Sequence, residues 1–343
     1  NGSATVSTAK TYPGGKLTAD SAAAPNGTIT VTALGLLALY ESITALKNAE
    51  LAGAMCYEAL RGTTKALDPR IHANKHHEEQ GSSADNLRRM LAGSNICETH
   101  VNDKVQDAYV MRCMPHIHGA AKKLVKEAYE VIVDEMHSVS DNPEIFAEGE
   151  NDGVALMSGN FDGSFVGAHA DMISMACAII GKVVERGTDR MVNRNLNDGL
   201  PAFLVSNPGL NSGFMIPQCT AAGLMNEIKH LAIPASIDSI PTCAGQEDPV
   251  SMAYYASKKA QACVRKLQYV TAIEIYTALQ ATDFLKPETP SPAIAKVRDF
   301  LRQTIPFVDN DRFLYPDIEY IFDRVRDCTL TDLVEEEIGE LAF

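Results

Sequence analysis

Apolar side chains recur at helical spacing in several long stretches of this chain. Between residues 28 and 61, for example, Leu34, Leu37, Ile43 and Leu46 follow one another at three- to six-residue intervals. Because residues three and four apart share one face of a helix, this spacing predicts a helix over 28–61. The same argument predicts helices over residues 83–91, 115–139, 166–192, 218–231, 249–282, 291–301 and 331–341.

The segments between these helices are rich in turn-forming residues. Residues 1–25 are mostly small and polar, which predicts a flexible N-terminal segment. Residues 147–163 and 193–214 are rich in Gly, Asn and Pro and are predicted loops, the first with a short hairpin. Runs that alternate apolar and polar residues are absent, as are internal repeats. We therefore expect an all-α fold: 1–25 flexible, and 26–343 one bundle of long, mostly antiparallel helices with functional loops.

Composition and charge narrow the class of protein. The 343 residues are 45% hydrophobic and 22% charged, as in soluble globular proteins. The net charge of −14 argues against nucleic acid as a partner, although a locally basic pocket for an anionic substrate remains compatible with it. With no signal-peptide pattern and no long uncharged apolar run, we expect a cytoplasmic protein that does not enter the membrane. Eight cysteines without a C-x-x-C pair suit reduced, buried thiols.

The most informative polar residues are Gln106, Tyr109 and Arg112, which are spaced by three. At helical pitch they share a face, where an amide, a phenol and a guanidinium can surround a small anion. Arginine binds a carboxylate through two parallel hydrogen bonds. The alternative is an ordinary solvated helix face.

Other polar motifs allow both structural and functional interpretations. Asn26 and Thr28 are each suited to cap the first long helix. Residues 207–214 contain two glycines and two asparagines, which a tight turn explains without any function. Glu247 precedes a predicted long helix, where the helix dipole favours a carboxylate. If Glu247 instead faces a pocket, it needs a cationic or N–H-bearing ligand.

The histidine-rich stretch around His72 is predicted to be structural or exposed. His76, His77, Glu78 and Glu79 follow closely, but the H-E-x-x-H zinc spacing is absent, so we predict no metal site. Phosphate-binding loops, nucleophile elbows and dinucleotide fingerprints are absent from the sequence as well.

In their number, order and spacing, these motifs resemble the histidine and aromatic amino acid ammonia-lyase family, over residues from about 25 to about 318. The matching segments are Asn26-Gly27-Thr28, Asp68-Pro69-Arg70-Ile71-His72, Leu91-Ala92-Gly93-Ser94, residues 105–113, Val139-Ser140-Asp141-Asn142-Pro143, Ser158-Gly159-Asn160-Phe161, Leu200-Pro201-Ala202-Phe203-Leu204, residues 207–214, Gln246-Glu247-Asp248 and Val250-Ser251-Met252.

The resemblance, closest to the histidine-type members, implies a carbon–nitrogen lyase that eliminates ammonia from histidine or a histidine-like amino acid to give an acrylate. It implies a cytosolic, mainly helical homotetramer whose active sites combine loops of three subunits. The family's electrophile is methylidene-imidazolone, formed from an Ala-Ser-Gly tripeptide. A phenylalanine or tyrosine ammonia-lyase or aminomutase is the enzymatic alternative, and a non-catalytic scaffold is the other.

The resemblance also implies roles for matching residues. Arg112 would bind the substrate carboxylate, and Gln106, Tyr109 and Asn26 would surround the electrophile and the amino group. Phe161 would pack near the prosthetic group, and Asn142 would help position the donors. Glu247 would bind the imidazole N–H or assist proton transfer.

Two departures from the family pattern bear on these roles. Ala-Ser-Gly does not occur in a suitable place, and the family's N-terminal portion, with its base tyrosine, has no counterpart here. We expect the C-terminal part of a larger enzyme, a chain completed by a second polypeptide, or a protein that is not a competent lyase. Pro249 stands where histidine-type members usually carry His, which is compatible with a modified histidine substrate such as a betaine.

Overall fold

The computed structural model describes residues 27–148 and 152–343 and confirms the all-α prediction. Its elements are α1 (Ile29–Ala59), η2 (Thr64–Leu67), α2 (Pro69–Ala73), α3 (Glu78–Met90), α4 (Asn95–His100), α5 (Tyr109–Arg112), α6 (Met114–Met136), β1 (Glu144–Ala147), β2 (Gly153–Leu156), α7 (Ser164–Val192), η3 (Ala202–Leu204), α8 (Met215–Leu231), η4 (Cys243–Gly245), α9 (Ala253–Asp283), α10 (Pro292–Arg302), α11 (Tyr315–Arg326) and α12 (Thr329–Ile338).

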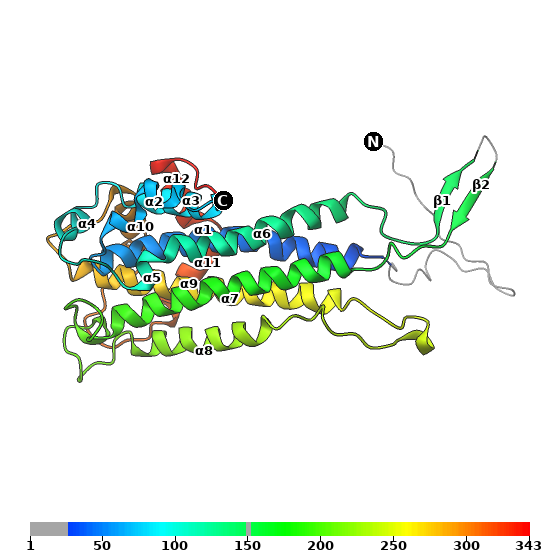
Figure 1. The fold of residues 1–343 in the computed structure, drawn as a ribbon. Coiled ribbons are helices and arrows are strands. Elements are labelled where there is room, and N and C mark those ends of the chain that lie inside the picture. Colours follow the sequence, from blue (N-terminus) through cyan, green and yellow to red (C-terminus); the bar gives the residue numbers. More distant parts are fainter. Residues whose placement is uncertain (1–26, 149–151) are drawn as a thin grey trace.

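Five long helices form an elongated bundle, in which α1, α7 and α9 run in one direction and α6 and α8 in the other (Figure 1). One end of the bundle carries the small helices α2 to α5 and α10 to α12; we call it the Arg112 end, because α5 finishes at that residue. The opposite end carries the hairpin β1–β2, the start of α7 and the segment 232–252; we call it the Glu247 end.

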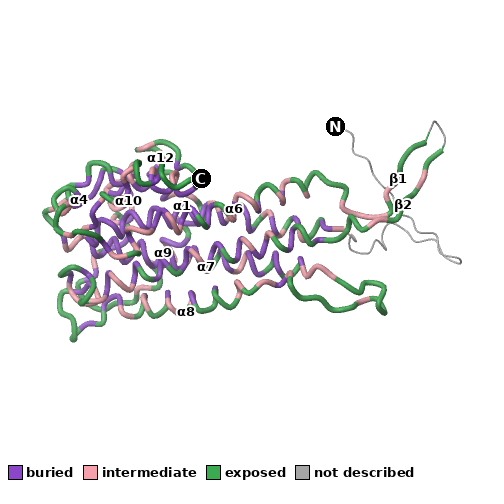
Figure 2. The backbone as a smooth tube through the Cα atoms, in the orientation of Figure 1, coloured by how far each residue is buried: buried purple, intermediate pink, exposed green. Residues whose placement is uncertain are grey.

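Burial is uneven along the bundle. Figure 2 shows buried backbone concentrated toward the Arg112 end and more exposed helices toward the Glu247 end. In α9, every residue from 270 to 282 is buried, because α1, α7, α8 and α11 surround it. This explains why this stretch has no exposed polar face, and its polar residues, such as Glu274 and Gln280, are buried as well.

Two of these core helices, α1 and α7, are long and apolar enough to span a membrane by length and composition alone, so the sequence-based exclusion of such segments was too strong. Both pack against α9 in the bundle. Each also carries buried acidic side chains, including Glu50 in α1 and Asp171 in α7. Packing inside the protein thus accounts for part of their apolar character, since 44% of the apolar window of α1 and 56% of that of α7 are buried.

The predicted hairpin is present and begins slightly earlier than expected. Strands β1 and β2 pair antiparallel, with Glu144 opposite Leu156 and Ala147 opposite Gly153. Helix α11 was not predicted, although it buries Ile318, Ile321 and Phe322 on one face. The cysteines are free, but Cys219 and Cys243 are exposed, which corrects the expectation that all thiols are buried.

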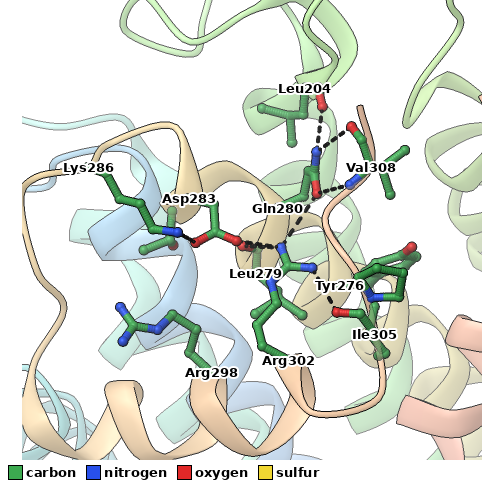
Figure 3. Close-up of polar contacts among 12 residues, drawn as sticks. Leu204, Tyr276, Leu279, Gln280, Asp283, Lys286, Arg298, Arg302, Ile305 and Val308 are labelled. Atoms are coloured by element: carbon green, nitrogen blue, oxygen red, sulfur yellow. Dashed lines mark hydrogen bonds and ion pairs between the residues drawn. The ribbon is translucent and has the colours of Figure 1, made fainter. Parts of the chain in front are cut away.

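A buried polar network ties the C-terminal end of α9 to two loops (Figure 3). The Gln280 amide nitrogen donates to the carbonyls of Leu204 at 3.1 Å and Val308 at 2.9 Å, and its oxygen accepts from the Val308 N–H at 3.1 Å. Beside it, Arg302 pairs with Asp283 at 2.8 Å. Because buried amides need partners, Gln280 fixes both backbone segments at the Arg112 end.

Candidate active site

Arg112 and Tyr109 lie together in the single turn of α5. The guanidinium carbon of Arg112 is 4.6 Å from the centroid of the Tyr109 ring, which is a cation–π arrangement. Tyr109 is 68% exposed, whereas Arg112 is half-buried and its Nε atom is buried without a hydrogen-bond partner in the described part of the chain. The pair therefore presents a phenol and a partly desolvated guanidinium at this end of the bundle.

The prediction that Gln106 shares one helical face with Tyr109 and Arg112 is wrong. Helix α5 begins only at Tyr109, and Ala108 before it is extended, with φ −62° and ψ 158°. The reason is Asp107, a buried residue whose carboxylate accepts the Thr63 N–H at 2.7 Å and so turns this stretch of backbone toward the core. Gln106 is nevertheless exposed at the same end of the bundle as Tyr109.

Strained backbone surrounds this end of the molecule. Arg61, Asp198, Phe203 and Leu204 all have positive φ, between 50° and 55°. Such conformations cost about 1–3 kcal/mol each and persist only where contacts enforce them, which is common at functional sites. Here Lys104 forms an ion pair with Asp198 at 2.5 Å and thereby holds the 193–205 loop against the segment that precedes Gln106.

The Gly- and Asn-rich segment 207–214 is a tight turn, as predicted, with Gly209 at φ 97° and Gly213 at φ 50°. The turn is anchored by Asp311, which was not among the predicted residues; its carboxylate accepts the N–H of Ser212 at 2.8 Å and of Gly213 at 2.8 Å. The Asp-Asn-Asp run over 309–311 was the available signal, since short acidic residues in a loop often accept backbone N–H groups.

The phenol and thiol groups buried behind this end stay neutral. Burial, followed by the charge of Asp107, raises the pKa of Tyr57 far above its usual range. Burial also raises the pKa of the Cys97 thiol to about 12. Neither group is suited to act as a base or nucleophile near neutral pH.

The histidine-rich stretch serves a structural purpose at His72. Its ring is buried, with Nε2 at 3.1 Å from the Ala66 carbonyl oxygen and Nδ1 at 2.9 Å from the Gln80 amide nitrogen. His76 and His77 are exposed. Among the residues that the structure describes, no group of three or more metal-binding side chains comes together.

Glu247 lies at the other end of the bundle, in the loop between α8 and α9. Helix α9 begins at Ala253 rather than at residue 249, so the expected position of Glu247 directly before the helix is wrong. Instead, Glu247 pairs with Thr242 across a small turn, with the Thr242 N–H donating to the Glu247 carbonyl at 2.8 Å and the Thr242 hydroxyl donating to its carboxylate. Cys243 and Ala244 within this turn have positive φ, which is a second cluster of backbone strain.

Two further predicted residues lie at the Glu247 end, in segments that flank the hairpin. Phe161, which is 38% exposed, precedes α7, and Asn142 follows α6. Gly163 fits closely against the start of α9, because a Cβ there would lie 2.8 Å from the Cβ of Ala253. Asn26 lies outside the described residues, but the Thr28 N–H donates to the Ser140 carbonyl at 3.3 Å, which joins the start of α1 to the Asn142 segment.

The predicted site residues therefore form two sets at opposite ends of one chain. Gln106, Tyr109 and Arg112 stand before α6, and Asn142 follows it. The 23 residues of α6 separate these sets by about 35 Å at 1.5 Å per residue. A single copy of the chain does not bring the two sets together.

Comparison with known proteins places this architecture in one family. The family model for aromatic amino acid lyases matches residues 9–303. A histidine ammonia-lyase from Symbiobacterium thermophilum is 41% identical over 316 residues, which cover 92% of this chain and 62% of that protein. This chain thus spans about 62% of the length of such curated relatives.

Solved structures agree on the fold. The crystal structure of histidine ammonia-lyase from Trypanosoma cruzi superposes with a TM-score of 0.84 and 35% identity, over 92% of this chain and 59% of that one. A tyrosine aminomutase from Streptomyces globisporus superposes with a TM-score of 0.86 and 28% identity, over 92% and 64% respectively. The chain belongs to the aromatic amino acid lyase family.

Proposed function

We propose that this chain is part of a carbon–nitrogen lyase that eliminates ammonia from histidine or a histidine-like amino acid to give a urocanate-type acrylate. The curated relatives at 39–41% identity are named histidine ammonia-lyases. The observation that carries the proposal is that one chain presents the Arg112–Tyr109 pair at one end and Glu247 at the other. These groups match the carboxylate, the amine and the imidazole N–H of histidine.

In this proposal, the active site forms between copies of the chain in a homo-oligomer, a tetramer in the family. Exposed apolar side chains on the long helices and the loops support such an assembly, because large exposed apolar areas mark interaction sites. They include Leu37, Tyr40, Tyr129, Phe165, Ile216, Ile233 and Tyr254, each more than half exposed. Antiparallel packing of two copies would set the Arg112 end of one beside the Glu247 end of another.

The proposed roles follow from the chemistry of each side chain. Arg112 binds the substrate carboxylate through its guanidinium fork, and its partial burial strengthens that contact. Tyr109 donates its hydroxyl hydrogen toward the reacting amine, and Gln106 supplies an amide beside it. Glu247 accepts the imidazole N–H or assists proton transfer, and Asn142 and Asn26 hold the donors in place.

The residues of this chain fit the family's methylidene-imidazolone group without supplying it. The exposed Gln106 amide and Tyr109 phenol are hydrogen-bond donors suited to a carbonyl-bearing ring, and Phe161 offers an apolar surface to pack against it. When bound, that group supplies an electrophile that makes the amine a better leaving group. Ala-Ser-Gly does not occur among these 343 residues, so the proposal places its source in polypeptide outside this sequence, whether the same chain or a second one.

We further propose a cytoplasmic location, which suits an enzyme of amino acid catabolism with free cysteines. An aromatic amino acid lyase or aminomutase is the alternative function, favoured by the TM-score of 0.86 with tyrosine aminomutase. Glu247 argues for an N–H-bearing ring instead, because a carboxylate covered by a purely apolar ring loses water and keeps only the Thr242 hydroxyl as a partner.

The direct test is ultraviolet absorbance of the full-length assembled enzyme incubated with histidine, then with a histidine betaine, then with phenylalanine or tyrosine. A conjugated acrylate absorbs where its saturated precursor does not. We expect the largest rate with histidine or its betaine. Turnover of phenylalanine or tyrosine alone would assign the aromatic function. The absence of any product, from an assembly that mass spectrometry shows to lack the dehydrated tripeptide, would favour a non-catalytic scaffold.

A further inference from the structure

The loop that carries Glu247 has very little packing of its own. Among residues 229–252, all of which the structure describes, Ala235 alone is buried. A cleft of about 290 Å³ lies at the base of this loop, lined in part by His230, Ile233, Tyr255 and Lys259. Apolar contacts therefore do not fix the loop, and polar contacts at its base have to do so.

Those polar contacts come from a buried ion pair between two core helices. Asp171 of α7 and Lys259 of α9 are 3% and 2% exposed, and their Oδ1 and Nζ atoms are 2.6 Å apart. The other carboxylate oxygen of Asp171 accepts the N–H groups of Ala235 and Ser236, both at 2.8 Å. The Lys259 ammonium also donates to the carbonyl of Ile233. Three backbone groups within four residues of the loop are thus held by one pair of charges.

From this base, hydrogen bonds continue to the tip of the loop. The Ser239 hydroxyl oxygen accepts the Val250 N–H at 2.9 Å and closes the neck. Beyond the neck, Thr242 and Glu247 pair through backbone and side chain. The orientation of Glu247 therefore depends on a short series of contacts that begins at Asp171 and Lys259.

We propose that the Asp171–Lys259 pair positions Glu247 for recognition of the substrate ring; this deepens the proposed function and rests on it. A packing role alone does not require charges here, since apolar side chains of similar volume often replace a buried ion pair without loss of stability. Apolar side chains provide no acceptor for the two N–H groups and no donor for the carbonyl. The pair is thus specific to holding this loop.

The first test is independent of activity and uses hydrogen exchange of the full-length assembly. The double variant Asp171→Leu/Lys259→Met removes both charges together and leaves neither unpaired. We expect amide exchange over 235–250 to accelerate by roughly tenfold or more, with α7 and α9 little changed. The variant Asp171→Asn/Lys259→Met keeps an acceptor oxygen for Ala235 and Ser236, so its exchange should be intermediate; it also serves if the first variant does not fold.

The matched control is another buried ion pair, between Glu50 and Lys122. The Oε1 atom of Glu50 lies 2.7 Å from the Nζ atom of Lys122, and both side chains are fully buried. The variant Glu50→Gln/Lys122→Met makes the change that Asp171→Asn/Lys259→Met makes, but between α1 and α6, which do not carry the loop. Its exchange over 235–250 should match that of the unmodified protein. Unchanged exchange in the Asp171 and Lys259 variants, or an equal increase in the control, would overturn the proposal.

The second test asks whether the pair acts through Glu247. Asp171→Leu/Lys259→Met should lower kcat/KM for histidine by roughly tenfold when Glu247 is present, but by less than about threefold in the Glu247→Gln background. A merely structural role predicts the same loss in both backgrounds and would refute positioning of Glu247. If the unmodified enzyme turns over no substrate, the proposed function fails, while the exchange experiment still decides whether the pair holds the loop.

Discussion

Arg112 and Glu247 lie at opposite ends of the same helical bundle, separated by the length of its long helices. Arg112 sits beside the start of α6, whereas Glu247 precedes the start of α9, which runs antiparallel to α6. A substrate the size of histidine cannot contact both residues of one copy. If both bind the same substrate, different copies must contribute them.

This separation predicts complementation between two inactive variants. Arg112→Ala and Glu247→Gln each damage one end of the chain, so co-assembled copies of the two variants contain some sites with both residues intact. For random co-assembly in a symmetric oligomer, about one quarter of the sites should be intact, and activity should return to about that fraction. The measurement is the histidine-dependent absorbance rate of co-expressed variants against each variant alone. No recovery from a mixed assembly would place both residues in the same copy's site.

Arg112→Ala should raise KM for any carboxylate substrate. A charge-assisted hydrogen-bonded pair is worth about 1.5–3 kcal/mol, which corresponds to a roughly 10- to 100-fold increase in KM. The KM of Arg112→Lys should lie between those of the unmodified enzyme and Arg112→Ala, because an ammonium keeps the charge but lacks the planar guanidinium fork. Steady-state kinetics of these variants would be compared with Arg324→Ala, a partly exposed arginine on α11. An unchanged KM in Arg112→Ala would remove this residue from carboxylate binding.

Glu247→Gln should discriminate between substrates by their rings. Loss of the carboxylate should lower kcat/KM for histidine by roughly tenfold or more, while phenylalanine, which has no ring N–H, should change by less than about threefold. Asp248→Asn is the neighbouring control, since Asp248 is also exposed in the same loop. Equal losses for both substrates would count against ring recognition by Glu247 and favour a role in proton transfer.

The fold was predictable because long helices carry a strong periodic signal. The predicted helix over 166–192 lies within two residues of the observed Ser164–Val192, since apolar spacing survives at every turn. Helix α11 was missed because its Pro316 and several charged residues mask a short buried face. Very short helices such as α5 were also missed, because four residues hold too few apolar positions to show a period.

The candidate site was predictable only as a set of residues, not as an arrangement. Spacing of three placed Gln106 and Arg112 on one helix, but the buried Asp107 extends the backbone between them. Asp171 lies 88 positions from Lys259 and 64 positions from Ala235 of the Glu247 loop, and such long-range pairing leaves no mark on local sequence. The resemblance to a family supplied the candidate residues, whereas only the structure separated them into two ends.

A final prediction concerns acid stability and rests on His118, which is fully buried in α6. Burial, reinforced by the charge of Lys122 and only partly opposed by Glu50, lowers the pKa of His118 to about 4 from its ordinary value of 6.5. Between about pH 4 and pH 6.5, the imidazole therefore stays neutral in the folded protein but binds a proton in the unfolded chain. The stability that the neutral imidazole contributes is complete above pH 6.5 and is lost as the pH falls toward 4. Between pH 7 and pH 5, His118 alone should reduce the free energy of unfolding by about 2 kcal/mol.

The variant His118→Met removes the titrating group, and His137→Met makes the same change at an exposed position just after α6. Urea unfolding gives the free energy of unfolding at pH 7 and at pH 5. Its decrease between these two pH values should be smaller for His118→Met than for the unmodified protein, by about 2 kcal/mol. Burial raises the pKa of Glu58 to about 7, so this residue increases the free energy of unfolding as the pH falls. Because Glu58 is present in all three proteins, it does not affect the comparison. If the free energy of unfolding decreases between pH 7 and pH 5 as much in His118→Met as in His137→Met, the buried imidazole is not the cause of the decrease.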